Sequence, residues 1–102
     1  MGIIYLLTNG NGQFKIGITT RKTTKRIKEL QTGNGDEIQM LAEFKSSFFR
    51  KIEGSLHRRY GTKRLKGEWF DLEQKDTQNF ISECQSLHDT FQLLKESGNP
   101  FI

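Results

Sequence analysis

The chain has 102 residues, a hydrophobic content of 33%, a mean hydropathy of −0.66 and a single cysteine, Cys84. This composition fits one domain with a modest core, excludes an intramolecular disulfide and argues against a zinc site built from thiolates. No segment approaches the length of a membrane-spanning helix, and the N-terminus lacks the pattern of a secretory signal, so we expect a protein of the cytoplasm.

The basic residues are concentrated in the middle of the sequence. The net charge is +4, and residues 45–67 contain eight Lys and Arg but only one acidic residue, Glu53. Residues 68–102 contain two basic and seven acidic residues. A basic block of this kind is either an ordinary solvated face or a surface for a polyanion such as DNA.

The first predicted elements form a hairpin. The segments "IIYLL" (3–7) and "QFKIGI" (13–18) have the pattern of strands, and "NGNG" between them supplies residues that accept a positive φ. These glycines connect a strand to a strand, so they do not form a nucleotide-binding loop, which would lead into a helix.

Helices and strands then alternate along the chain. We expect a helix from about Thr23 that stops at Gly33, a strand at 38–44, a helix at 48–60, a basic connector at 62–67, a short apolar segment at 68–72 and a helix from about 76 to 96. The predicted fold is an α+β domain of order β-β-α-β-α-α, with a small, mostly antiparallel three-stranded sheet flanked by helices.

Four side chains of this arrangement are expected to share one cleft. Tyr5 and Lys15 lie on neighbouring strands, while Arg26 and Glu53 lie at the edges of the apolar stripes of their helices. Such a set has the groups that phosphodiester hydrolysis requires. Glu53 could hold Mg²⁺ or Mn²⁺, Arg26 could clamp the phosphate, and Tyr5 could activate water, with Lys15 lowering its pKa.

Each of these residues also has a simpler interpretation. Tyr5 would be an ordinary strand aromatic and Lys15 a solvated lysine. Arg26, in a helix rich in Lys and Arg, would simply contact phosphates, and Glu53 would be one half of a salt bridge with Arg50 or His57. His57 itself shares the helix face of Glu53, so it could hold the glutamate, transfer a proton, contact DNA or simply be exposed. The residues expected to contact DNA phosphates are Arg21, Lys22, Lys25, Arg58, Arg59, Lys63, Arg64 and Lys66.

At these positions the chain resembles the GIY-YIG nucleases. "GIIY" ends at Tyr5, "FKIG" has Lys15 where a tyrosine is usual, and Arg26 in "TKRIKEL" and Glu53 in "IEGSLH" match the family's arginine and metal-binding glutamate. The resemblance covers Gly2 to about Leu72 and is nearest to a phage-type branch, often catalogued as a DNA-binding domain, that shares "KIG", "E…LH" and "GEWF".

The resemblance implies a single nuclease domain over residues 1–102, with a core at about 2–72 and a C-terminal helix at about 76–96. Its activity would be metal-dependent cleavage of DNA, with Tyr5, Lys15, Arg26, Glu53 and His57 in the site. The chain departs from the family at Leu30, where His or Tyr is common, and lacks an Asn some fifteen residues after Glu53. The alternative is therefore a non-catalytic DNA-binding module on the same fold.

An attached reader domain often supplies the specificity of such nucleases. We expect no second domain of this kind, so the specificity for DNA would be weak, or would come from a separate partner or from a homodimer. A phage-encoded protein of this type would act in the cytoplasm of the host. A third interpretation, a protein-interaction domain that uses the acidic last helix, predicts no salt-sensitive DNA binding at all.

Overall fold

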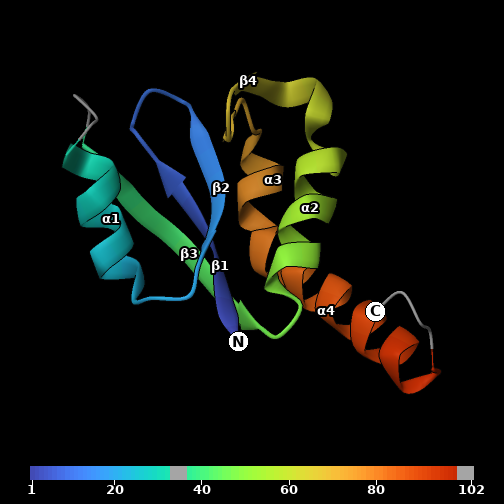
Figure 1. The fold of residues 1–102 in the computed structure, drawn as a ribbon. Helices are drawn as coiled ribbons and strands as arrows, with labels where there is room; N and C mark the ends of the chain where they lie inside the picture. Colours follow the sequence, from blue (N-terminus) through green and yellow to red (C-terminus); the bar gives the residue numbers. More distant parts are fainter. Residues whose placement is uncertain (33–36, 99–102) are drawn as a thin grey trace.

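A five-stranded antiparallel sheet forms the centre of the domain (Figure 1). The computed structural model describes residues 1–32 and 37–98. The strand order is β3-β1-β2-β5-β4. The strands are β1 (Gly2–Thr8), β2 (Phe14–Thr19), β3 (Gln39–Ser46), β4 (Arg64–Lys66) and β5 (Trp69–Phe70). The predicted α+β class and the predicted hairpin of β1 and β2 are confirmed.

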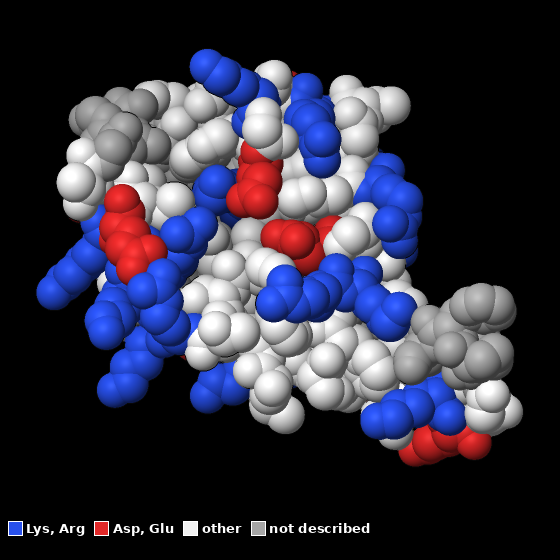
Figure 2. All heavy atoms as spheres, viewed as in Figure 1, with Lys and Arg blue, Asp and Glu red and all other residues white. Residues whose placement is uncertain are grey.

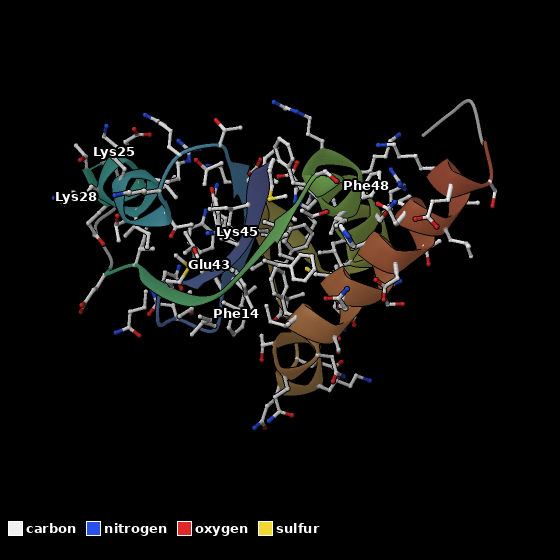
Figure 3. All side chains as sticks on the ribbon, turned by 90° about the horizontal axis from the view of Figure 1, so that it is seen from below. Phe14, Lys25, Lys28, Glu43, Lys45 and Phe48 are labelled. Carbon is white, nitrogen blue, oxygen red and sulfur yellow. The ribbon has the colours of Figure 1, made fainter. Side chains whose placement is uncertain are left out.

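Helices cover both faces of this sheet. They are α1 (Thr23–Thr32), α2 (Phe49–Arg59), α3 (Gln74–Gln78) and α4 (Phe80–Glu96), with a 3₁₀ turn at Gly61–Lys63. Viewed along the sheet, the strands run between α1 on one side and α2 with α4 on the other (Figure 3). Among the described residues, no helix is long and apolar enough to cross a membrane.

The alternation of side chains along β1 divides the core in two. Ile4 and Leu6 join Ile16, Ile52 and the other residues of the larger cluster beneath α2 and α4. Tyr5 and Leu7 point to the opposite face and pack with Ile38 and with the apolar side of α1. Because successive residues of a strand face opposite sides, a strand buried on both faces has a continuous apolar sequence, and β1 is such a strand.

Two predicted features differ from the structure. The sheet has five strands where three were expected, because the connector at 62–67 and the apolar segment at 68–72 form a short hairpin, β4 and β5, which turns at Gly67 with a φ of +59°. Strands of two and three residues are too short to show a periodic pattern. Phe14 and Lys15 of β2 hold this hairpin by pairing with Phe70 and Trp69.

The C-terminal helix ends at Glu96 as predicted, but its beginning and its continuity differ. It begins at Gln74 instead of at about 76, and it is divided at Asn79 into α3 and α4. The Asp76 carboxylate accepts a hydrogen bond of 3.0 Å from the backbone N–H of Glu73, so Asp76 lies at the third position of the first turn and forms a capping box with Glu73. The predicted helix stop at Gly33 lies outside the described residues.

Candidate nucleic-acid site

The tyrosine of the site lies across the neighbouring strand. Tyr5 is 1% exposed and faces Gly17 in the β1–β2 pair. A methyl group added at Gly17 would lie 2.5 Å from Cζ of the Tyr5 ring, closer than atoms can approach. Gly17 is therefore required by the ring above it, and this packing fixes the position of the Tyr5 hydroxyl.

Arg26 contacts that hydroxyl from α1. Its Nε–H donates to the Tyr5 hydroxyl at 3.4 Å, and its Nη1 is 3.2 Å from the carboxylate of Glu29. Burial raises the pKa of Tyr5 above its usual value of 10, although the hydrogen bond and the charge of Arg26 act to lower it. The predicted lowering of the Tyr5 pKa is therefore wrong for this structure, because desolvation outweighs the neighbouring cation.

Lys15 lies on the same face of the sheet as Tyr5, but its ion pair is with Glu68 of the β4–β5 hairpin. Its Nζ lies 3.1 Å from the carboxylate of Glu68 and 5.8 Å from the centre of the Trp69 ring, and its side chain is only 13% exposed. Lys15 and Trp69 are partners in the β2–β5 ladder, which places the lysine beside the hairpin that follows α2. The structure thus joins Lys15 to Glu68, a contact that no local sequence pattern predicts.

Glu53 is a half-buried carboxylate without a close partner. It forms no hydrogen bond or ion pair with any described residue, so neither structural salt bridge considered for it, with Arg50 or with His57, is formed. Burial raises its pKa, His57 lowers it and Glu68 raises it. The charge of Glu53 also acts to raise the pKa of Tyr5, on which burial has the largest effect.

His57 connects α2 to the sheet. Its Nε2 lies 2.8 Å from the carbonyl oxygen of Ile16, its Nδ1 lies 3.4 Å from Arg64, and its ring packs against Phe70. A proton on Nε2 allows the ring to donate to the carbonyl and to accept from Arg64. Because both ring nitrogens have partners, His57 is better suited to holding α2 against β2 than to transferring a proton.

The basic residues form two groups on either side of this site. Over α1, Lys22, Lys25 and Lys28 form no ion pair with a described residue, and Lys25 and Lys28 point away from the sheet (Figure 3). Arg21 pairs with Glu29 at 2.6 Å. Figure 2 shows these basic side chains over α1, a second group over α2, and acidic side chains between them.

The second basic group is partly neutralised. Arg59 pairs with Glu83 at 2.8 Å, and Lys63 pairs with Asp76 at 2.6 Å, so both are held by the acidic C-terminal segment. Arg64 lies over the ring of Phe70. Among the eight residues predicted to contact phosphates, five carry charges that no described acidic side chain pairs, namely Lys22, Lys25, Arg58, Arg64 and Lys66.

A pocket of about 250 Å³ adjoins the site at the end of β2. This arginine pocket is lined by Ile18, Thr19, Thr20, Arg21, Arg26, Phe49 and Arg50. Arg50 was considered only as a salt-bridge partner of Glu53. Its place three residues before Glu53, near the same side of the helix, was the signal that could have identified it as part of the site.

The site offers few ligands for a metal ion. Within residues 1–32 and 37–98, no group of three or more His, Cys, Asp and Glu side chains could hold one. Mg²⁺ commonly binds to one or two carboxylates and completes its coordination with water and substrate phosphate. The unpaired Glu53 carboxylate fits such a cation, and Glu68 is the second carboxylate whose charge acts on it.

A small α+β domain with these basic groups, a buried tyrosine bonded to a half-buried arginine, and an unpaired carboxylate is of the nuclease-like or DNA-binding class. The model of the T5orf172 domain matches residues 2–85, which include the whole sheet and every residue of the candidate site. The chain therefore belongs to the T5orf172 domain family, which indicates DNA as its partner. No curated protein and no solved structure matches the chain.

Proposed function

We propose that the domain is a metal-dependent DNA endonuclease of the GIY-YIG type. The observation that carries the proposal is Glu53, a half-buried carboxylate that forms no hydrogen bond or ion pair with a described residue and whose charge acts on Tyr5. An acidic side chain placed for stability alone would be expected to pair with a nearby cation. Glu53 instead keeps a coordination position open within a basic surface that suits a phosphate backbone.

Glu53 would hold Mg²⁺ or Mn²⁺. The bound cation would neutralise charge on the phosphate oxygens and lower the pKa of coordinated water. The raised pKa of Glu53, caused first by burial, is consistent with a carboxylate that is more stable with a cation beside it than alone.

The protein's own groups would carry the proton and orient the phosphate. Arg26 would bind the phosphate through Nη2, and through Nη1 once this nitrogen leaves Glu29. The ionised Tyr5 would take a proton from water, the resulting hydroxide would form a bond to phosphorus, and the bond to the leaving oxygen would break. That oxygen would take a proton from solvent, and Lys15, released from Glu68, would stabilise its charge.

A plasmid assay tests this proposal. Purified protein should nick supercoiled DNA with Mg²⁺ or Mn²⁺ and not with EDTA. Glu53→Gln should abolish nicking while DNA affinity stays equal or rises slightly, because the variant removes a metal ligand and one negative charge from a basic surface. Glu53→Gln protein that cuts at the wild-type rate would remove Glu53 from the mechanism.

The second candidate function is a DNA-binding module without catalysis. It is favoured by the raised pKa of Tyr5 and by the pairing of Lys15 with Glu68, since both leave the site less reactive in the absence of DNA. Salt-sensitive binding by a protein that never nicks plasmid with either metal would support this module.

A further inference from the structure

The arginine pocket extends the site along β2. We propose that it binds a second phosphate of the same DNA strand, next to the phosphate at Tyr5 and Glu53, with Arg50 and Arg21 as its ligands. This inference rests on the proposed DNA substrate but does not require cleavage. The pocket lies where the first turns of α1 and α2 approach the end of β2, and the amino ends of helices carry partial positive charge.

The charges that line the pocket are suited to an anion. Three guanidinium groups border it and no acidic side chain does. Arg21 and Arg26 both pair with Glu29, whereas Arg50 forms no ion pair with any described residue. A phosphate is the ligand that several guanidinium groups together bind best, because each can donate two parallel hydrogen bonds.

Arg50 is held in place before any ligand binds. Its guanidinium lies 5.0 Å from the centre of the Phe49 ring, and that ring lies directly against Gly2. A methyl group added at Gly2 would lie 2.5 Å from Cδ2 of Phe49, so the glycine gives the ring its place. A cation that already rests on an aromatic ring loses less side-chain freedom when it binds.

The geometry of β2 indicates that the pocket binds a second phosphate, and that its arginines do not simply add contacts to the phosphate at Tyr5. The Tyr5 hydroxyl lies at Gly17, whereas the arginine pocket begins at Ile18 and continues past the end of β2 to Arg21. The two residue steps from Gly17 to Thr19 alone span roughly 7 Å. Arg26 contacts the Tyr5 hydroxyl and also lines the pocket, so consecutive phosphates of one strand can occupy the two places with Arg26 between them.

Short oligonucleotides separate the two phosphates experimentally. Binding of the dinucleotide TpT, which has one phosphate, and of the trinucleotide TpTpT, which has two, would be measured by NMR titration of the whole chain in EDTA. The wild type should bind TpTpT about tenfold more tightly, the gain expected from one additional charge-assisted contact. In Arg50→Gln this ratio should fall to roughly twofold or less, with affinity for TpT nearly unchanged.

Lys51→Gln is the matched control, because it removes one charge from the next exposed position of α2, outside the pocket. It should keep the tenfold ratio, and thermal unfolding should show that both variants are folded. The proposed phosphate site is refuted if the wild type binds TpTpT no more tightly than TpT. It is also refuted if Arg50→Gln weakens the binding of TpT and TpTpT equally, or if Lys51→Gln lowers the affinity ratio. Absence of plasmid nicking would refute the nuclease and leave this result unaffected.

Discussion

Gly17 provides a direct test of how the Tyr5 ring is packed. In Gly17→Ala the new methyl group would lie 2.5 Å from Cζ of Tyr5, and the ring must move. Tyr5 is 1% exposed and is packed with Leu7 and Ile38, so it has little space to accept the displacement. Overpacking of this kind costs about 1–3 kcal/mol of the free energy of unfolding.

Thermal and urea unfolding would measure this loss. Each kcal/mol lowers the Tm of a domain of this size by roughly 4–8 °C. Gly54→Ala is the matched control, because its methyl group would meet only the end of the Arg58 side chain, at 3.4 Å, inside α2. Alanine favours a helix over glycine by roughly 0.5–1 kcal/mol, so this second variant should be more stable than the wild type.

A second substitution separates the clash from a general intolerance of β2. Tyr5→Leu removes the ring atoms that the new methyl group would meet, so Gly17→Ala should cost less in a Tyr5→Leu background than in the wild type. The reasoning is refuted if Gly17→Ala is as stable as the wild type. It is also refuted if the cost of Gly17→Ala is the same in both backgrounds.

Three further outcomes are expected. Because the pKa of Tyr5 is raised above 10, the rate of cleavage should increase steadily from pH 7 to 9 if ionised Tyr5 is the base. Tyr5→Phe should lose both the activity and this pH dependence. A wild-type rate that does not change with pH would contradict the role of Tyr5 as the base. Lys25→Gln should flatten the salt dependence of DNA binding by about one unit and Arg59→Gln by less, since Arg59 pairs with Glu83; equal slopes would show that this ion pair opens on DNA. Burial acts to raise the pKa of Asp76, but hydrogen bonds from Lys63 and from the Glu73 N–H lower it overall, so its stabilisation exists above the unfolded pKa of about 4 and is lost as pH falls through the folded value. Asp76→Asn should therefore destabilise the domain by about 1 kcal/mol at pH 7, and its Tm should approach that of the wild type below pH 4; a constant difference would exclude the ionised carboxylate as the cause.

The periodic segments of the sequence determined the first part of the fold. The continuous apolar run of β1 and the strand-forming residues of β2 enclose an Asn- and Gly-rich turn, which sets the two strands antiparallel and places Tyr5 and Lys15 on one face. The apolar stripes of α1 and α2 fixed which sides of these helices meet the sheet. These features depend on local geometry, so neighbouring residues are enough to predict them.

Contacts between distant segments decided the rest. The β4–β5 hairpin exists because Phe14 and Lys15 offer it a strand edge, and only that pairing brings Glu68 to Lys15. The pKa of Tyr5 depends on how completely α1 and β2 bury its hydroxyl. A local sequence pattern can predict that a cation lies near the hydroxyl, but it cannot predict how far the hydroxyl is removed from water. The arginine pocket likewise forms from β2, α1 and α2 together, so Arg50 acquires its place in the site only when the chain has folded.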